Sequence, residues 1–206
     1  MAGSDPRALS RALLDLCRGR KLTIATAESC TGGLVAAALT DIPGSSDVID
    51  RGFVTYSNDA KHAMLGVKTS TLESFGAVSK ETAMQMAVGA LEEADVDLAV
   101  SITGIAGPGG ATPGKPVGLV HFAAAARDGR IVHKECRFGA IGRTQVRQRS
   151  VLEALRLLMD LARGPKPPAK KREVASQAQP RVARSPRRAA VKRRLVKVPS
   201  KPKPAK

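Results

Sequence analysis

The composition of the chain changes abruptly after Arg163, and this change limits which part of it is able to fold. Residues 164–206 carry 15 Lys and Arg against one acidic residue, with few large apolar side chains. Such a segment buries too little apolar surface to offset the entropy that folding removes from the chain. We therefore predict one folded domain over residues 1–163 and a disordered basic tail over residues 164–206.

The predicted domain is close to neutral, because it holds 19 Lys and Arg and 17 Asp and Glu. The net charge of +16 therefore describes the tail, and any affinity for polyanions is expected there. Aromatic residues make up 2% of the chain, so the core must consist mainly of Ala, Val, Leu, Ile and Met. Such a core favours helices packed on a sheet over a β-sandwich, which is usually richer in aromatic residues.

Segments with helical periodicity alternate with short apolar segments that are typical of buried strands. Helices are expected over 6–18, from about 31, around 61, over 79–94 and over 142–162, and strands over 22–27, 50–56, 97–103, 117–126 and 131–138. The last two strands are joined at Asp128-Gly129, as in a hairpin. This order predicts an α/β fold, namely a three-layer α/β/α sandwich with a mixed sheet.

The three cysteines and three histidines have neither the spacing of metal ligands nor that of a disulfide framework. We therefore expect no metal and no cofactor. No apolar run approaches the roughly 20 residues needed to cross a membrane, and the N-terminus lacks the pattern of a secretory signal. These features predict a cytoplasmic protein without a membrane partner.

A candidate nucleophile, Ser29, lies between a predicted strand and a predicted helix, within the sequence ESCTGG at 28–33. The start of a helix offers free N–H groups and the positive end of the dipole, and the two glycines permit a close backbone approach. The backbone N–H groups of Thr31, Gly32 and Gly33 are therefore predicted to hold an oxyanion. Two alternatives remain open: Ser29 or Thr31 caps the helix, or the loop cradles a phosphate without reacting.

Lys61 is a candidate general base, expected in the first turn of a short helix that begins at Ser57 or Asn58. The positive end of the helix dipole lowers the pKa of a lysine there, and a Ser–Lys hydrolase requires such a base. The alternatives are an ordinary surface lysine, or His62 as the base. Tyr56, the only tyrosine, lies five residues before Lys61.

Two further features are candidates for substrate binding. Thr103 precedes the loop Gly104–Gly118, which is rich in Gly and Pro, and long loops without regular structure are often functional. Arg143, Arg147 and Arg149 begin the last helix, where cations oppose the dipole and an anionic ligand such as a phosphate would remove the conflict. The alternatives are a plain crossover loop and a solvated arginine face.

Four motifs in register carry a resemblance to a known family. They are AESCTGG (27–33), GFVTYSNDAK (52–61), GAVS (76–79) and SITGIAGPGGATPGKPVGLV (101–120). Over about residues 8–162 the chain resembles the CinA C-terminal domain family, including its stand-alone form, nicotinamide-nucleotide amidohydrolase. The basic tail is no part of the family pattern.

The resemblance implies a three-layer α/β/α fold, a homodimer, and hydrolysis of nicotinamide mononucleotide to nicotinate mononucleotide and ammonia. It places the catalytic serine, tyrosine and lysine of the family at Ser29, Tyr56 and Lys61. Its substrate loop falls at Thr103, Gly104, Ala106 and Gly107. We expect neutral Lys61 to activate Ser29, with Tyr56 as a hydrogen-bond relay, and loop 103–107 with Arg147 and Arg149 to hold ribose and phosphate.

A second class of function is also consistent with the sequence. The tail contains RRAAVKRRLVKV (187–198) and Ser-Pro steps, and its charge is able to bind polyanions with a steep dependence on salt. The alternative function is therefore a nucleotide-binding or DNA-associated protein that acts through residues 164–206. A solvated, non-specific extension is the simpler interpretation of the same residues.

Overall fold

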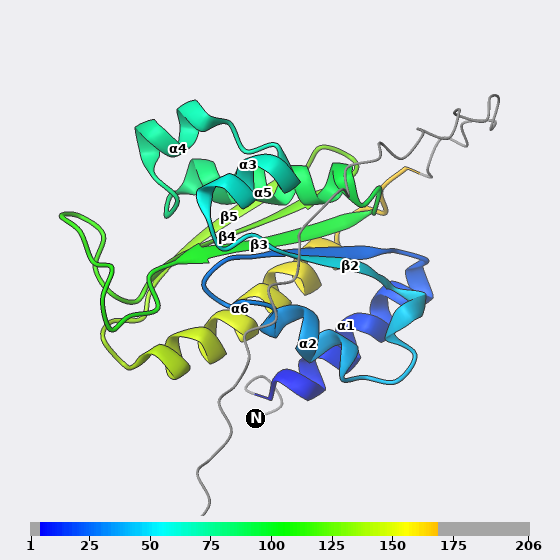
Figure 1. The fold of residues 1–206 in the computed structure, drawn as a ribbon. Coiled ribbons are helices and arrows are strands. Elements are labelled where there is room, and N and C mark those ends of the chain that lie inside the picture. The colour runs from blue at the N-terminus through cyan, green and yellow to red at the C-terminus, as the bar shows by residue number, and fades with distance from the viewer. Residues whose placement is uncertain (1–4, 169–206) are drawn as a thin grey trace, which may run out of the picture. The chain divides into compact units, whose positions relative to one another are not determined.

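The computed structural model describes residues 5–168 and has a five-stranded sheet between two layers of helices (Figure 1). The spatial order of the strands is β2 (Ile49–Val54), β1 (Ile24–Glu28), β3 (Leu98–Gly104), β4 (Leu119–Ala126) and β5 (Ile131–Arg137). Strand β1 is parallel to both of its neighbours, whereas β4 is antiparallel to β3 and to β5. The predicted mixed sheet and its terminal hairpin are confirmed.

The helices cover both faces of the sheet (Figure 1). One face carries α1 (Pro6–Arg20), α2 (Leu34–Thr40) and α6 (Arg143–Arg163), and the other carries α3 (Asn58–Leu65), α4 (Thr69–Phe75) and α5 (Lys80–Glu93). A single 3-10 turn, Ser45–Asp47, precedes β2. The three-layer α/β/α arrangement is confirmed, and α4 is the helix that the sequence pattern did not predict.

The core is built from small and aliphatic residues, as the composition predicts. Strand β4 is buried along its whole length, and its Ala123 and Ala125 pack with Ala83 and Ala87 of α5. Larger side chains fill the opposite face, where Phe122 of β4 belongs to one cluster with the leucines of α1 and α6. Each large aliphatic side chain that is fully buried there contributes about 1.5–3 kcal/mol.

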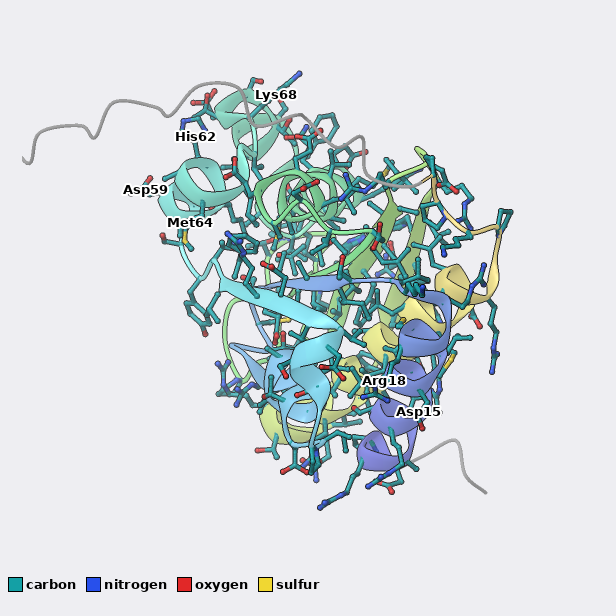
Figure 2. All side chains as sticks on the ribbon, turned by 90° about the vertical axis from the view of Figure 1, so that its right-hand side faces the viewer. Asp15, Arg18, Asp59, His62, Met64 and Lys68 are labelled. Atoms are coloured by element: carbon teal, nitrogen blue, oxygen red, sulfur yellow. The ribbon has the colours of Figure 1, made fainter. Side chains whose placement is uncertain are left out.

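Polar side chains cap the starts of several helices. Ser79 accepts a hydrogen bond from the backbone N–H three residues later and begins α5, as predicted. Ser57 begins α3 in the same way, and Asp5 caps α1. Asp15 and Arg18 form an ion pair of 2.8 Å on the outer side of α1 (Figure 2). These caps satisfy N–H groups that have no partner within the helix.

Helix α2 begins at Leu34, three residues later than the sequence pattern indicated. Gly32 and Gly33 adopt φ angles of 61° and 96°, in a region that glycine reaches without steric cost and that a right-handed helix does not use. The two glycines therefore belong to a turn between β1 and α2. Ser29 is carried by this turn and not by the helix itself.

Residues 1–4 and 169–206 lie outside the described part of the chain. The predicted tail falls almost wholly there, and the domain boundary after residue 163 remains a prediction, although α6 ends at Arg163. Among residues 5–168, no helix combines the length and the hydrophobicity needed to cross a membrane. The same residues contain no group of three or more His, Cys, Asp and Glu side chains placed to hold a metal ion.

Candidate active site

The topology of the sheet places most of the predicted site residues at one end of its strands. Strands β2, β1 and β3 are parallel, so their carboxyl ends meet there, which is where ligands bind in open α/β sheets. Ser29 follows β1, Thr55 and Tyr56 follow β2, and Thr103 lies at the end of β3. The backbone N–H of Ser29 donates to the carbonyl of Ile102 at 2.9 Å, which ties the turn to β3.

Ser29 and Lys61 are 32 positions apart in sequence and in direct contact in the structure. Lys61 Nζ lies 3.1 Å from Ser29 Oγ and donates to the Thr55 carbonyl oxygen at 2.9 Å. Lys61 is only 1% exposed and Ser29 9% exposed. No ion pair of Lys61 occurs among the described residues. The alternative of an ordinary surface lysine is therefore wrong.

Burial lowers the pKa of Lys61, because a charged ammonium loses its hydration in the interior and no acidic side chain replaces it. The direction agrees with the expectation from sequence, but the main cause is burial, whereas the expectation named the helix dipole. A neutral amine within hydrogen-bond distance of a serine hydroxyl is able to accept its proton. The distance between the two side chains and the lowered pKa of Lys61 are therefore those expected of a nucleophile and its general base.

Two neighbouring groups are excluded as substitutes for this pair. Cys30 is buried, and burial raises the pKa of its thiol to about 12, so the thiolate that would be required as a nucleophile is disfavoured. His62 is exposed on the outer side of α3 (Figure 2), where its Nδ1 lies 2.9 Å from the Val67 carbonyl oxygen. Neither residue is placed to act in place of Lys61 or Ser29.

Tyr56 is not joined to the Ser29–Lys61 pair by a hydrogen bond in the described chain. Its hydroxyl accepts a hydrogen bond from Arg143 Nη2 at 3.0 Å, and its side chain is largely exposed, at 62%. Arg143 Nη1 donates to the Gly107 carbonyl oxygen at 3.1 Å. The structure therefore offers no contact for the expected relay through Tyr56. Arg143 instead links Tyr56 to the Gly/Pro-rich loop.

The prediction that Gly32 and Gly33 offer free N–H groups is corrected by the structure. The Gly33 N–H donates to the carboxylate of Glu28 at 3.0 Å, and the Gly32 N–H donates to the Ser29 carbonyl oxygen at 3.1 Å. Within residues 5–168, the N–H groups of Cys30 and Thr31 donate to no other residue. Of the three predicted donors, only the Thr31 N–H therefore remains for an oxyanion, and the Cys30 N–H is a further candidate.

The predicted substrate loop reaches the same edge of the sheet, but its first residues are engaged in packing. Thr103 Oγ1 donates to the Ala77 carbonyl oxygen at 2.7 Å. A Cβ at Gly104 would lie 2.7 Å from a side-chain carbon of Val120, so glycine is required there for the contact between β3 and β4. Ala106 is buried, and only Gly107, through its carbonyl oxygen, contacts Arg143.

The three arginines at the start of α6 separate into two groups. Arg143 and Arg147 are four residues apart and share one side of the helix, and Arg147 Nη2 donates to the Thr31 carbonyl oxygen at 2.8 Å. Arg149 is exposed beside Pro6 and Leu152, so the structure does not bring it to the site. The conflict with the helix dipole is thus relieved for two of the arginines by backbone carbonyl groups.

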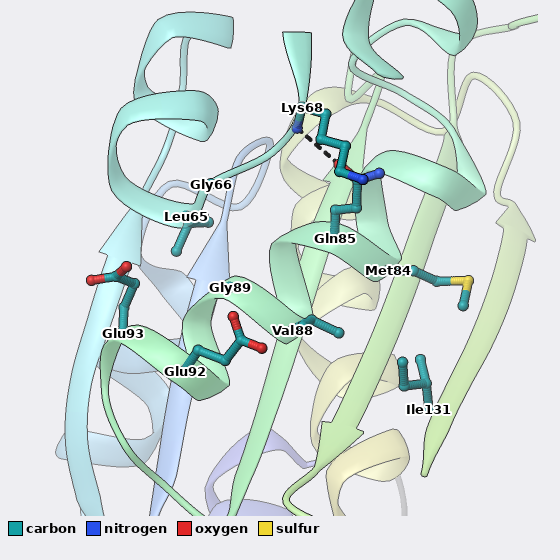
Figure 3. A pocket seen from close by; sticks show the side chains of 10 residues that line it. All are labelled: Leu65, Gly66, Lys68, Met84, Gln85, Val88, Gly89, Glu92, Glu93 and Ile131. Carbon is teal, nitrogen blue, oxygen red and sulfur yellow. Dashed lines mark hydrogen bonds between the residues drawn. The ribbon is translucent and has the colours of Figure 1, made fainter. Parts of the chain in front are cut away.

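A pocket of about 390 Å³ lies elsewhere, between α3 and α5 (Figure 3). The pocket is lined by Leu65, Gly66, Lys68, Met84, Gln85, Val88, Gly89, Glu92, Glu93 and Ile131. None of these is a predicted site residue, and none is a nucleophile paired with a base. The amide N–H of Lys68 donates to Gln85 across its rim (Figure 3). The Ser29–Lys61 edge is therefore the stronger candidate for chemistry.

Sequence reasoning missed two residues of the site. The ESCTGG motif gives Glu28 no role, although an acidic residue at the end of a buried strand is unusual and is a detectable signal. The sequence pattern gives Arg143 no role distinct from those of Arg147 and Arg149, although helical spacing pairs it with Arg147. The hydrogen-bond partners of Arg143 are distant in sequence, so the local pattern does not identify these partners.

Comparison with known proteins gives a consistent result. The family model for the CinA C-terminal domain matches residues 6–162. "Nicotinamide-nucleotide amidohydrolase PncC" of Escherichia coli (strain K12) is 49% identical over 159 residues, which are 77% of this chain and 95% of that protein. A "CinA-like protein" of Chlorobium phaeovibrioides is 54% identical over 121 residues, 59% of this chain and 28% of that longer protein.

A solved structure agrees with these relatives. The competence/damage inducible protein CihA from Agrobacterium tumefaciens has a TM-score of 0.75 and 56% sequence identity, and the match covers 76% of this chain and 94% of that one. The predicted enzyme class, an amidohydrolase, agrees with the name of the Escherichia coli relative. On the family model, the identities and the shared fold, the chain belongs to the CinA C-terminal domain family.

Proposed function

We propose that this protein hydrolyses the carboxamide of nicotinamide mononucleotide to nicotinate mononucleotide and ammonia. The observation that carries the proposal is the buried Lys61 amine, 3.1 Å from the Ser29 hydroxyl at the carboxyl edge of the sheet. The substrate is taken from the names of relatives, such as the Escherichia coli amidohydrolase at 49% identity.

The reaction proceeds in two halves. The neutral amine of Lys61 accepts the proton of Ser29 Oγ, and the oxygen attacks the carboxamide carbon. Collapse of the tetrahedral intermediate breaks the C–N bond, and Lys61 returns its proton to the leaving nitrogen, which departs as ammonia. Water then attacks the acyl ester while Lys61 accepts its proton, and that proton returns to Ser29 as nicotinate mononucleotide leaves.

The oxyanion of each tetrahedral intermediate requires donors close to Ser29. The N–H groups of Cys30 and Thr31 meet this condition, because they donate to no other residue within 5–168. The N–H of the residue that follows a nucleophilic serine has this role in other hydrolases. We therefore assign the oxyanion to Cys30 and Thr31, in place of Gly32 and Gly33.

The nucleotide part of the substrate is assigned to Arg143, Tyr56 and the loop 103–107. The Arg143 guanidinium lies between the Tyr56 hydroxyl and the Gly107 carbonyl oxygen, and a guanidinium is well suited to bind a phosphate. Tyr56 is exposed and offers an aromatic face to a ligand. Tyr56 therefore contacts substrate in this proposal and does not relay a proton.

The proposal is tested by ammonia release from nicotinamide mononucleotide. Wild-type protein and Cys30→Ala are expected to release ammonia, and Ser29→Ala to lose several orders of magnitude in kcat. Cys30→Ala is the matched control, since it alters the same turn without removing the hydroxyl. Full activity of Ser29→Ala, or no activity of the wild type on this and related pyridine nucleotides, would sink the proposal.

Three further expectations remain predictions: a cytoplasmic location, a homodimer and binding of nucleic acid through residues 164–206. The last is tested with duplex DNA, which the full chain is expected to bind and residues 1–163 are not. Because the tail carries 15 Lys and Arg, the affinity is expected to fall steeply with salt. Equal binding by both proteins would remove the tail as the cause. The alternative function requires, in addition, that amidase activity be absent.

A further inference from the structure

The turn that carries Ser29 contains two consecutive glycines with positive φ, Gly32 at 61° and Gly33 at 96°. Glycine has the largest conformational freedom of all residues, so a Gly-Gly turn does not hold its own shape. A defined shape is nevertheless needed, because the oxyanion donors assigned to Cys30 and Thr31 are parts of this turn. One bond within the turn, from the Gly32 N–H to the Ser29 carbonyl oxygen at 3.1 Å, fixes only part of it, so further contacts from outside are needed.

Glu28 provides the first of these contacts. Its carboxylate is fully buried and accepts hydrogen bonds from the N–H groups of Gly33 at 3.0 Å, Val35 at 3.0 Å and Ala36 at 2.8 Å. Thr26 Oγ1 lies 3.3 Å from the same carboxylate. These bonds fasten the end of the turn and the start of α2 to β1. They also occupy the donors at the N-terminus of α2, so these donors do not serve a substrate.

Arg147 provides the second contact, from α6. Its Nη2 donates to the Thr31 carbonyl oxygen at 2.8 Å, which orients the peptide group between Thr31 and Gly32. A Cβ added at Gly32 would lie 3.6 Å from the same nitrogen, so the guanidinium lies over the turn. The Arg147 side chain is half-buried, and its Nε is buried without a hydrogen-bond partner among the described residues.

We propose that Glu28 and Arg147 are positioning residues that hold the Ser29–Gly33 turn from two sides, and that Arg147 does not bind the phosphate. The expected effect on kcat rests on the proposed function, whereas the contacts of Glu28 and Arg147 are independent of it. Glu28 holds the Gly33 N–H and Arg147 holds the Thr31 carbonyl, so the two peptide groups that flank Gly32 are both fixed. Phosphate recognition is thereby left to Arg143.

Hydrogen exchange of the backbone tests the inference without any assay of activity. In Glu28→Gln, an NH₂ group replaces one acceptor oxygen and faces N–H donors, so the amides of Gly33, Val35 and Ala36 are expected to exchange about 10- to 100-fold faster. Arg147→Gln is expected to accelerate exchange of the Gly32 amide, which belongs to the peptide group that Arg147 orients, by about 10-fold. Arg149→Gln, two residues along the same helix and exposed, is the matched control and is expected to leave this turn unchanged.

Kinetics with two substrates separate positioning from phosphate binding. Arg147→Gln is expected to lower kcat about 10-fold or more, with KM within about twofold of the wild type. The same fractional loss is expected for nicotinamide riboside, which lacks the phosphate. Arg147→Lys, which keeps one donor for the Thr31 carbonyl, is expected to recover part of kcat.

Each outcome decides a different point. A rise of KM confined to the phosphorylated substrate, with kcat unchanged in Arg147→Gln, would overturn the inference and restore Arg147 as a phosphate ligand. Equal exchange of the turn in Arg147→Gln and Arg149→Gln would overturn it as well. If the wild type releases no ammonia, the proposed function fails, whereas the exchange experiment still decides whether the turn is held as described. A Glu28→Gln protein that does not fold leaves the Arg147 variants to decide.

Discussion

Replacement of Lys61 by methionine is the most direct test of the chemistry, because methionine keeps an unbranched apolar chain of nearly the same length and lacks the terminal amine. In the structure, that amine is 3.1 Å from Ser29 Oγ, a distance that permits direct proton transfer. Two neighbouring groups within residues 5–168 are unsuited to replace it: His62 is turned to the Val67 carbonyl oxygen, and the Cys30 thiol has its pKa raised to about 12. Neither group therefore substitutes for Lys61 in the variant.

The loss of a general base lowers rates by about 100- to 10,000-fold, which corresponds to about 2.7–5.5 kcal/mol of transition-state stabilisation. We expect Lys61→Met to lie toward the upper end, since the neighbouring Glu28 carboxylate is engaged by three backbone N–H groups. The assay is steady-state ammonia release as a function of pH. Because the pKa of Lys61 is lowered by burial, wild-type kcat/KM is expected to rise with pH through that pKa, and the residual rate of Lys61→Met to lack this rise.

Stability provides the control for folding. Unfolding returns the Lys61 amine to water, where it binds a proton up to about the ordinary lysine pKa of 10.5. Between the lowered pKa and 10.5 the unfolded state binds more protons, so wild-type stability rises with pH in this range, and Lys61→Met removes that contribution. A Lys61→Met protein that keeps more than about a tenth of wild-type kcat with an unchanged pH profile would refute the reasoning.

The remaining predictions concern stability. A Cβ at Gly89 of α5 would lie 1.9 Å from the Leu65 carbonyl oxygen, so Gly89→Ala is expected to lower the free energy of unfolding by about 1–3 kcal/mol. Gly19→Ala, where a Cβ meets nothing within 4 Å, is the helical control and is expected to raise it by about 0.5–1 kcal/mol; equal effects in urea unfolding would contradict both. Burial acts to raise the pKa of Glu153, but hydrogen bonds from Lys134 and a neighbouring arginine outweigh it and lower this pKa. Glu153→Gln is therefore expected to cost about 1 kcal/mol at about pH 7. Because the pKa of Glu153 is lowered from 4.5, this difference should disappear as the pH falls through that lowered pKa; a difference that persists at still lower pH would show a cause other than charge.

The sequence by itself determined the architecture and pointed to the candidate reactive residues. The alternation of helical and strand periodicities predicted the three-layer sandwich, because apolar spacing records which face of an element is buried. Ser79 was recognised as a helix cap from local pattern alone. Ser29 and Lys61 were selected by their motifs, and the two side chains are in contact in the structure.

Only the tertiary structure decided which partner each polar group has. Glu28 takes the N–H groups that were expected to be free, and Arg143 and Arg147 contact the site whereas Arg149 does not. A hydrogen bond depends on distances of about 3 Å between atoms, and these are set when segments tens of residues apart pack together. Residue spacing along one element does not contain that information, so the environment of Lys61, and with it the cause of its lowered pKa, follows from the packing of α3 against the end of β2.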